Sequence, residues 1–124
     1  MIGAIIGDIV GSRFEFGPAP LKSFELFTPD CSYTDDTICT IAIADAVLNE
    51  RDYQESLLDW CRRYPEPMGG YGKRFYQWIN AENPQPTDSF GNGSAMRVSP
   101  IGWLFDEWED VIEEAKKSAI VSHN

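Results

Sequence analysis

The spacing of apolar residues along the chain predicts a succession of helices. In the first stretch, MIGAIIGDIVGSRF, apolar side chains recur at three- and four-residue intervals and share one helix face, at Ile2, Ile5, Ile6, Ile9 and Val10. This stretch is too short to span a membrane, and Asp8 interrupts it. We therefore predict a core helix at this end of the chain.

Three glycines lie on one face of this predicted helix. Gly3, Gly7 and Gly11 are spaced four residues apart. Each glycine weakens a helix by about 1 kcal/mol relative to alanine. Their presence predicts that another backbone packs very close to this face inside the protein.

The remainder of the chain alternates loops with further helical stretches. Residues 14–33 contain three prolines and no clear period, which indicates a loop, and residues 81–94 form a second predicted loop. Helices are predicted from Thr34 onward, over residues 53–63, over a short stretch closing near Asn80, over residues 95–105 with Pro100 ending or kinking it, and over residues 108–122. Asp45 interrupts the apolar stripe of the helix that begins near Thr34. No segment alternates with a period of two over the length of a strand, so the predicted fold class is all-α.

Composition and charge narrow the classes of function. The 124 residues suffice for one domain, which we predict over residues 1–124. Ten basic residues against twenty acidic ones give a net charge of −10, which argues against nucleic acid or an anionic membrane as the partner. Cys31, Cys39 and Cys61 show no CxxC spacing and follow no secretory leader. We expect reduced thiols in a cytoplasmic protein.

The segment YTDDT places two adjacent carboxylates at the start of a predicted helix. In one interpretation Thr34 caps the helix while Asp35 and Asp36 lie in its first turn, where the helix dipole favours negative charge. In the other, these carboxylate and hydroxyl oxygens hold a hard cation such as Mg²⁺, Ca²⁺ or Mn²⁺. The two interpretations are compatible, because a helix start can both be capped and bind an ion.

Two further segments contain candidate chemistry. In GDIVGSRFEF, Glu15 lies between Phe14 and Phe16, which suits a partly desolvated acid with a raised pKa, or else an ordinary surface carboxylate. In DSFGNGSAMR, the glycines of a turn that precedes a helix can offer free backbone N–H groups to an anion, with Phe90 available to stack on a base. The alternative is a plain glycine turn with Ser94 as the helix cap. No Gly-Lys-Ser/Thr follows, so the segment is not a P-loop.

Taken in order, these segments resemble the N-terminal half of the ADP-ribosylglycohydrolase family, including its dinitrogenase-reductase-activating members. The resemblance runs from GAIIGDIVGSRFEF through YTDDT to GNGSAMRVSPIGWL and the final SHN, and so spans essentially the whole chain. It implies an orthogonal multi-helix fold and a Mg²⁺-dependent hydrolase. The implied reaction removes ADP-ribose from a modified protein side chain or a related acceptor, with two Mg²⁺ ions, or sometimes Mn²⁺, at the foot of the cleft.

The resemblance also implies roles for individual residues. Thr34, Asp35 and Asp36 would be metal ligands, and Glu15 would act with the two aspartates in catalysis as the acid/base near the distal ribose. The substrate-binding residues would be Ser89, Phe90, Gly91, Asn92, Gly93, Ser94 and His123. Phe90 would face the adenine, and the backbone amides of the loop would neutralise the pyrophosphate without a basic patch.

The chain departs from the family pattern in its length. The family domain is roughly twice as long, and its C-terminal half carries an Asp-x-Asp-Ser/Thr motif that completes the metal site, whereas this sequence contains no Asp-x-Asp. We interpret the chain as the N-terminal portion of the family domain. The gene is truncated, only this part of the protein was expressed, or a longer protein was cleaved. We expect weak metal binding, little or no hydrolysis by the isolated chain, and exposed apolar surface that favours self-association or a separate C-terminal half.

Two other functions compete with the hydrolase. One is a non-catalytic module that binds ADP-ribose or another nucleotide through the glycine loop. The other is a purely structural helical piece that oligomerises through its open face. Neutralising Asp35 and Asp36 distinguishes the hydrolase from the binding module, because metal-dependent hydrolysis would be lost while binding through the loop would remain.

Overall fold

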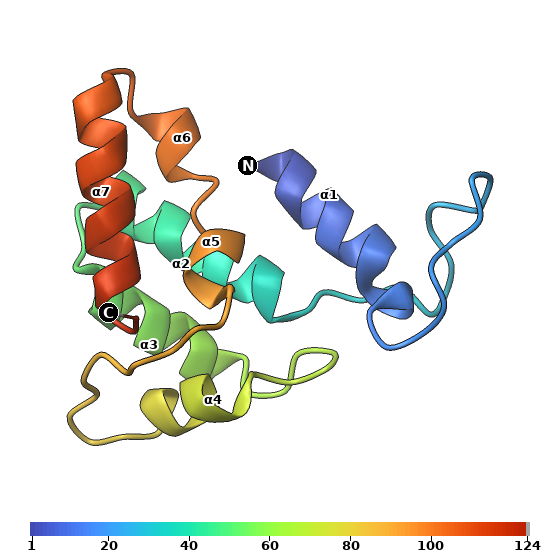
Figure 1. Ribbon diagram of the computed structural model, residues 1–124, viewed down its shortest axis with the longest axis horizontal. Coiled ribbons are helices and arrows are strands. Elements are labelled where there is room, and N and C mark those ends of the chain that lie inside the picture. The colour runs from blue at the N-terminus through green and yellow to red at the C-terminus, as the bar shows by residue number, and fades with distance from the viewer. Residues whose placement is uncertain (124) are drawn as a thin grey trace.

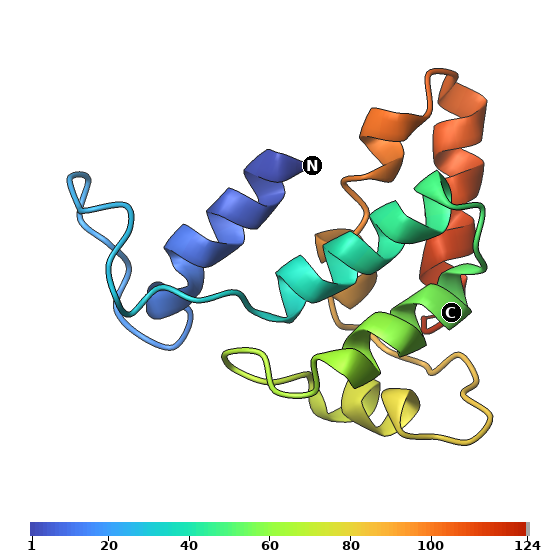
Figure 2. The same ribbon diagram turned by 180° about the vertical axis from the view of Figure 1, so that it is seen from behind.

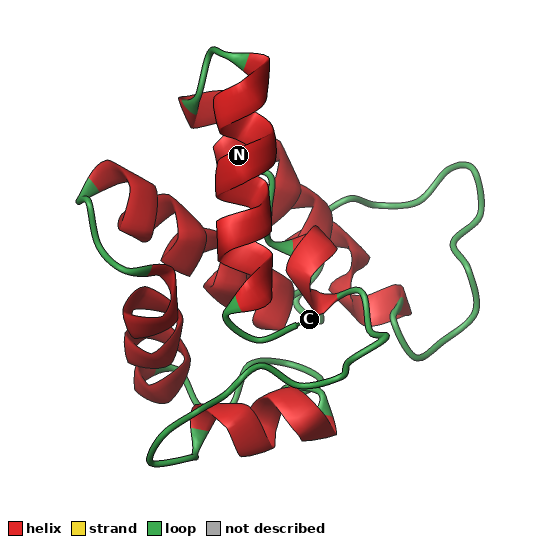
Figure 3. Cartoon of the chain, turned by 60° about the vertical axis from the view of Figure 1, so that its left-hand side comes forward, coloured by secondary structure: helices red, strands yellow, loops and turns green. Residues whose placement is uncertain are grey.

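The computed structural model describes residues 1–123, and their regular structure is helical throughout, with no strand (Figure 3). The elements are α1 (Ile2–Gly11), the 3₁₀ helix η1 (Ser12–Phe14), α2 (Asp35–Leu48), α3 (Tyr53–Arg63), α4 (Lys73–Ile79), α5 (Gly93–Met96), α6 (Ile101–Leu104) and α7 (Trp108–Ile120). The prediction of an all-α fold is confirmed. No helix among residues 1–123 has the length and apolar character needed to cross a bilayer.

Helix α2 is the centre of the packed part of the molecule. It lies along α3, and α5 and α6 pack on it from another side, while α7 contacts α3, α5 and α6, and α4 contacts α3 (Figure 1). The buried side chains that join these helices are Ile38, Cys39, Ala42, Ile43, Leu57, Cys61, Trp78, Ile79 and Ile101. Cys39 and Cys61 face each other from α2 and α3 with their sulfur atoms 3.9 Å apart, and all three cysteines are free thiols, as predicted.

Asp45 interrupts the apolar stripe of α2 because it links this helix to its neighbours. Its carboxylate accepts hydrogen bonds from Trp60 Nε1 of α3 at 3.0 Å, from Arg51 Nη1 at 2.5 Å and from Ser56 Oγ at 3.3 Å. The bond from the Trp60 indole contributes most to a lowered pKa of Asp45. The carboxylate therefore secures the contact between α2 and α3.

The substitution Asp45→Ala is expected to lower the free energy of unfolding by about 2 kcal/mol, because the partly buried indole N–H of Trp60 loses its acceptor. Since the folded-state pKa of Asp45 is lowered, its contribution is present above the unfolded-state pKa of about 4 and is lost as the pH falls through the folded-state value. Urea unfolding at pH 7 and pH 3 measures both effects. The control is Asp59→Ala, which removes a more exposed partner of Arg51 and should cost less than about 0.5 kcal/mol. Equal losses in the two variants would contradict this account.

Helix α1 stands apart from the packed helices, and the prediction of a core helix is wrong for residues 1–123. None of its residues is buried, and Ile2 and Ile6 are 70% and 47% exposed. A β-carbon added to Gly3, Gly7 or Gly11 would meet no atom of residues 1–123 within 4 Å, so no backbone in that range packs against this face. Figure 2 shows α1 beside the start of α2 and well away from α3 and α7. Its apolar face finds no partner among the described residues.

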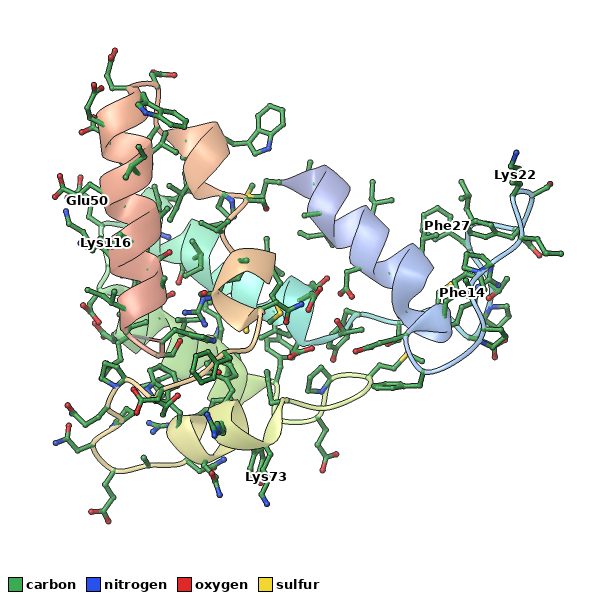
Figure 4. All side chains as sticks on the ribbon, in the orientation of Figure 1. Phe14, Lys22, Phe27, Glu50, Lys73 and Lys116 are labelled. Carbon is green, nitrogen blue, oxygen red and sulfur yellow. The ribbon has the colours of Figure 1, made fainter. Side chains whose placement is uncertain are left out.

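Instead of the single predicted helix, residues 95–105 contain the end of α5 and the whole of α6. Helix α5 ends at Met96, and Pro100 occupies the N-cap position of α6, so the proline begins a helix. The loop that precedes α2 follows the predicted range and extends away from the helices, with Lys22 at its far end (Figure 4).

Candidate active site

The start of α2 has the capping geometry that its sequence predicts. Thr34 is the N-cap residue, and its Oγ1 accepts a hydrogen bond from the backbone N–H of Asp36 at 3.2 Å. Asp35 and Asp36 occupy the first turn of the helix. No side chain among residues 1–123 donates a hydrogen bond to either carboxylate, and the bond recorded for Asp35 comes from its own backbone.

Asp8 holds this helix start in place from α1. Its Oδ1 accepts from Thr34 Oγ1 at 2.6 Å, and its Oδ2 accepts from Thr34 N at 2.9 Å. The same Oδ2 also accepts from Thr37 Oγ1 at 2.6 Å and Thr37 N at 3.3 Å. One carboxylate therefore satisfies four donors of α2, and two of them belong to the hydroxyls of buried threonines. The sequence offered no signal for this role, because Asp8 precedes Thr34 by 26 residues.

The carboxylates near the start of α2 line a pocket that we call the acidic pocket. It has a volume of about 660 Å³, and its walls include Asp8, Glu15, Asp35 and Asp36, with glycines of α1 and of the loop before α4. Among residues 1–123, no Lys, Arg or His lines it. Burial, followed by repulsion from Asp36, raises the pKa of Asp35 to about 6. Burial followed by repulsion between carboxylates also raises the pKa of Asp36 and of Glu15.

Glu15 belongs to this pocket through its contact with Gly69. The Oε2 atom of Glu15 and the ring of Phe16 lie 3.3 Å and 3.1 Å from the place that a β-carbon on Gly69 would occupy. Gly69 also has φ +80°, a conformation that favours glycine. Phe14 packs edge-to-face on Phe24 with their centroids 5.3 Å apart. Glu15 and Phe16 therefore both lie close to the backbone of Gly69, and burial is the main cause of the raised pKa of Glu15.

The carboxylate oxygens of the acidic pocket are the type of ligand that a hard cation prefers. Asp35 and Asp36 supply carboxylate oxygens without a cationic partner, and Mg²⁺ prefers such ligands. These ligands are too few for a complete site, because no three His, Cys, Asp or Glu side chains among residues 1–123 lie close enough together to hold a metal ion. Thr34 Oγ1 is already engaged with Asp8 and with the backbone of Asp36. The set fits part of a metal site.

A second pocket of about 340 Å³ contains the glycine loop, and we call it the loop pocket. Ser89, Gly91, Asn92 and Gly93 line it, and His123 closes one side. Three basic side chains also line it, at Lys73, Arg74 and Arg97. The sequence did not predict these basic side chains, because the loop amides alone were expected to face the anion. The local charge of this pocket is positive, although the chain carries a net charge of −10.

Two predicted loop residues lie outside the lining of the loop pocket. Phe90 is fully exposed, and Ser94 follows the first residue of α5, whose N-cap is Asn92. The aromatic wall of the pocket is instead formed by Phe75 and Trp78 of α4, whose rings stack with centroids 5.3 Å apart and an interplanar angle of 10°. Their spacing in the aromatic run KRFYQWIN could have indicated one helix face, but not its proximity to the loop.

The two pockets are adjacent. Asp35, Gly72, Asn92 and Met96 line both of them, so the start of α2 separates a pocket of acids from a pocket that contains three bases. This arrangement can accept a molecule with an anionic part and a metal-bound part.

Comparison with known proteins shows the family of this chain. A model of the ADP-ribosylglycohydrolase family matches residues 1–124. The chain belongs to this family. Among its relatives, the ADP-ribosylhydrolase ARH3 proteins of Xenopus tropicalis and Gallus gallus are each 28% identical, over 153 and 162 aligned residues that cover 99% of this chain. The protein of the same name from Homo sapiens is 27% identical over 158 residues. The chain spans about 43% of the length of each of these relatives. No solved structure gives a significant match.

Proposed function

We propose that this chain forms the N-terminal part of a Mg²⁺-dependent hydrolase that removes ADP-ribose from a modified protein side chain or from a small ADP-ribose conjugate. The observation that supports this most directly is that a pocket lined by acids and a pocket lined by three bases lie side by side and share Asp35 and Asn92 in their linings. ADP-ribose has the matching chemistry, since its diphosphate is anionic and its ribose hydroxyls are ligands for a metal ion. The name of the family and of its relatives agrees with this substrate class.

Each pocket would bind one part of the substrate. In the loop pocket, the backbone N–H groups around Gly91 and Gly93 and the bases Arg74 and Arg97 would face the diphosphate, while Phe75 would offer a ring to the adenine. This assigns the aromatic contact to α4, whereas the exposed Phe90 would need to turn inward to supply it.

In the acidic pocket, Asp35 and Asp36, with Thr34, would hold Mg²⁺ or Mn²⁺, which when bound orients ribose hydroxyls and lowers the pKa of a bound water. Cleavage at the anomeric carbon develops positive charge that nearby carboxylates stabilise. Glu15 has a raised pKa and an exposed position at this pocket, which suit an acid/base that exchanges a proton with water or the leaving group.

The length of the chain bears on its activity. Because the chain spans about 43% of the length of its relatives, we expect further metal ligands from residues outside these 124. We propose that a second copy or a separate C-terminal half completes the metal site. The isolated chain is expected to bind metal weakly and to hydrolyse little or nothing.

Calorimetric titration of ADP-ribose into the purified chain, with and without Mg²⁺, tests the proposal. We expect binding that Mg²⁺ strengthens about tenfold, which corresponds to about 1.4 kcal/mol. Adenosine is the control ligand, because it lacks the diphosphate and the distal ribose and should bind with no dependence on metal. Binding of ADP-ribose at equal strength with and without Mg²⁺ would favour the non-catalytic binding module. Absence of binding in both conditions would contradict the proposal.

A further inference from the structure

Arg97 is a buried cation without a carboxylate partner among residues 1–123. Its side chain is 1% exposed, its guanidinium lies 5.7 Å from the centroid of the Phe75 ring, and no Asp or Glu in that range forms an ion pair with it. Its Nη2 donates to the backbone oxygen of Ser118 at 2.9 Å and to Ser122 Oγ at 2.8 Å. Its Nε has no hydrogen-bond partner in the described part of the chain. A charge buried in this way is costly unless it stabilises something nearby.

Two hydrogen bonds in series connect Arg97 to His123 through the hydroxyl of Ser122. The Oγ atom of Ser122 lies 2.9 Å from Nδ1 of His123. Arg97 can only donate, so Ser122 Oγ must accept from it and keeps its own hydrogen for another acceptor. Among residues 1–123, no other acceptor bonds to this hydroxyl. Because Ser122 is 2% exposed, an unused hydroxyl hydrogen there would carry the cost of an unsatisfied buried donor.

The backbone around His123 fixes the ring beside the glycine loop. The N–H of His123 donates to the backbone oxygen of Ala119 at 3.0 Å, which continues the turn at the end of α7. Thr87, at the start of the loop, donates to the backbone oxygen of Ser122 from both its N and its Oγ1, each at 3.2 Å. A β-carbon on Gly93 would lie 3.4 Å from Cε1 and 3.5 Å from Nε2 of His123. The Nε2 edge of the ring therefore faces the loop pocket, and no protein group in the described part of the chain bonds to it.

We infer that Arg97 and Ser122 are positioning residues that hold His123 as the neutral tautomer protonated at Nε2, so that this N–H donates to a phosphate oxygen in the loop pocket. The inference rests on the proposed function, and it adds to it the hydrogen-bond path that sets the state of the histidine. When Ser122 donates to Nδ1, the ring proton must reside on Nε2. The anionic acceptor is favoured over a neutral hydroxyl by the unpaired positive charge of Arg97 beneath the pocket. Burial and the same positive charge lower the pKa of His123, which keeps the ring neutral at pH 7.

Nitrogen-15 NMR of the imidazole ring tests the tautomer directly. His123 is the only histidine, so the ring signals of the full chain, prepared without a histidine tag, belong to it alone. At pH 7.5 and without ligand, we expect Nδ1 to show the chemical shift of an unprotonated, hydrogen-bonded nitrogen and Nε2 that of a protonated one. A protonated Nδ1 in this spectrum would overturn the inference.

Two matched serine substitutions separate positioning from a general loss of structure. Ser122→Ala removes the hydroxyl between Arg97 and His123. Ser118→Ala removes a similarly buried hydroxyl of α7, whose one hydrogen bond within residues 1–123 goes to the backbone oxygen of Ala115. We expect Ser122→Ala to shift the Nδ1 resonance toward that of free imidazole and to weaken ADP-ribose binding about three- to tenfold. We expect Ser118→Ala to change neither. An unchanged ring spectrum and an unchanged affinity in Ser122→Ala would refute the inference.

The two readouts also distinguish this inference from the proposed function. If ADP-ribose binds but Nδ1 carries the proton, the proposed function stands and the positioning role of Ser122 is wrong. If the tautomer is as expected but neither ADP-ribose nor inorganic pyrophosphate shifts the Nε2 resonance, His123 is not a ligand-binding donor. In that case the inference fails together with the proposed assignment of the loop pocket.

Discussion

The substitution Asp8→Asn is expected to lower the free energy of unfolding of the metal-free chain by about 3 kcal/mol. Asparagine has nearly the shape of aspartate, but it replaces one accepting oxygen by an NH₂ group. That group would face the donors of Thr34 or Thr37, which the carboxylate now satisfies at 2.6 to 3.3 Å. Buried donors that lose their acceptor cost about 1–3 kcal/mol each, and bonds to a charged acceptor are the stronger kind.

An opposing electrostatic effect is smaller. Asp8 contributes to the raised pKa of Asp35, Asp36 and Glu15, so neutralising it relieves some repulsion. Burial precedes Asp8 as a cause in all three cases, and the acidic pocket is open to water, which screens the interaction. The loss of hydrogen bonds should therefore decide the sign.

Urea unfolding at pH 7 measures this effect, and hydrogen exchange locates it. The backbone N–H groups of Thr34 and Thr37 should exchange faster in Asp8→Asn, because both donate to the carboxylate. Glu66→Gln makes the same change of charge at an exposed site and should alter stability by less than about 0.5 kcal/mol. A variant as stable as this control, with unchanged exchange at the start of α2, would show that Asp8 does not hold the two helices together.

The local features of the fold could be predicted from the sequence because they depend on neighbouring residues. Thr34 caps α2 because a threonine before two acidic residues and an apolar run provides the hydroxyl where the first free N–H groups lie. The loop before α2 follows from its prolines, and α3 follows from the spacing of its apolar residues. The division of residues 95–105 could not be predicted in this way, because a proline suits the first turn of a helix as well as its end.

The features that failed depend on distant partners. The apolar face of α1 predicted burial, but burial needs a surface to pack against, and residues 1–123 supply none for that face. In the candidate site, the sequence identified Asp35, Asp36 and Glu15, which line the pockets, and the glycine loop, which lines the loop pocket except for Phe90 and Ser94. It could not identify the roles of Asp8 and Arg97, because their partners lie 21 to 29 residues away in the chain and meet them only after folding.

The second large effect is expected from Asp35→Asn combined with Asp36→Asn. In the metal-free chain, an aspartate whose folded-state pKa is raised makes the folded state bind protons more tightly than the unfolded state. Stability is then highest near pH 4 and falls as the pH rises through the folded-state pKa, which is about 6 for Asp35. Because the side chain is only partly buried, we expect this fall to amount to about 2 kcal/mol. The double variant should lack the fall and should be more stable than the unmodified chain at pH 7.5.

A matched pair of acids provides the control. Glu109 and Asp110 are adjacent carboxylates in the first turn of α7, as Asp35 and Asp36 are in α2, but both are exposed. There the helix dipole dominates, so Glu109→Gln with Asp110→Asn should lower stability by about 0.3–1 kcal/mol for each residue. If the two double variants change stability in opposite directions, the acids of α2 destabilise the metal-free fold. Helix capping alone does not explain such an effect.

Mg²⁺ should reverse the order of stability of the unmodified chain and the Asp35→Asn, Asp36→Asn variant. A cation bound between Asp35 and Asp36 relieves their repulsion and stabilises the folded chain according to its concentration and dissociation constant. We expect 10 mM Mg²⁺ to raise the unfolding temperature of the unmodified chain at pH 7.5, to leave the Asp35→Asn, Asp36→Asn variant unchanged, and to act on the α7 control as on the unmodified chain. If Mg²⁺ stabilises all three proteins equally, it binds elsewhere, and the acids of α2 would not form part of a metal site. A rise confined to the two proteins that retain Asp35 and Asp36 would connect the strain in this helix start to the ion that relieves it, since the same two carboxylates would account for both measurements.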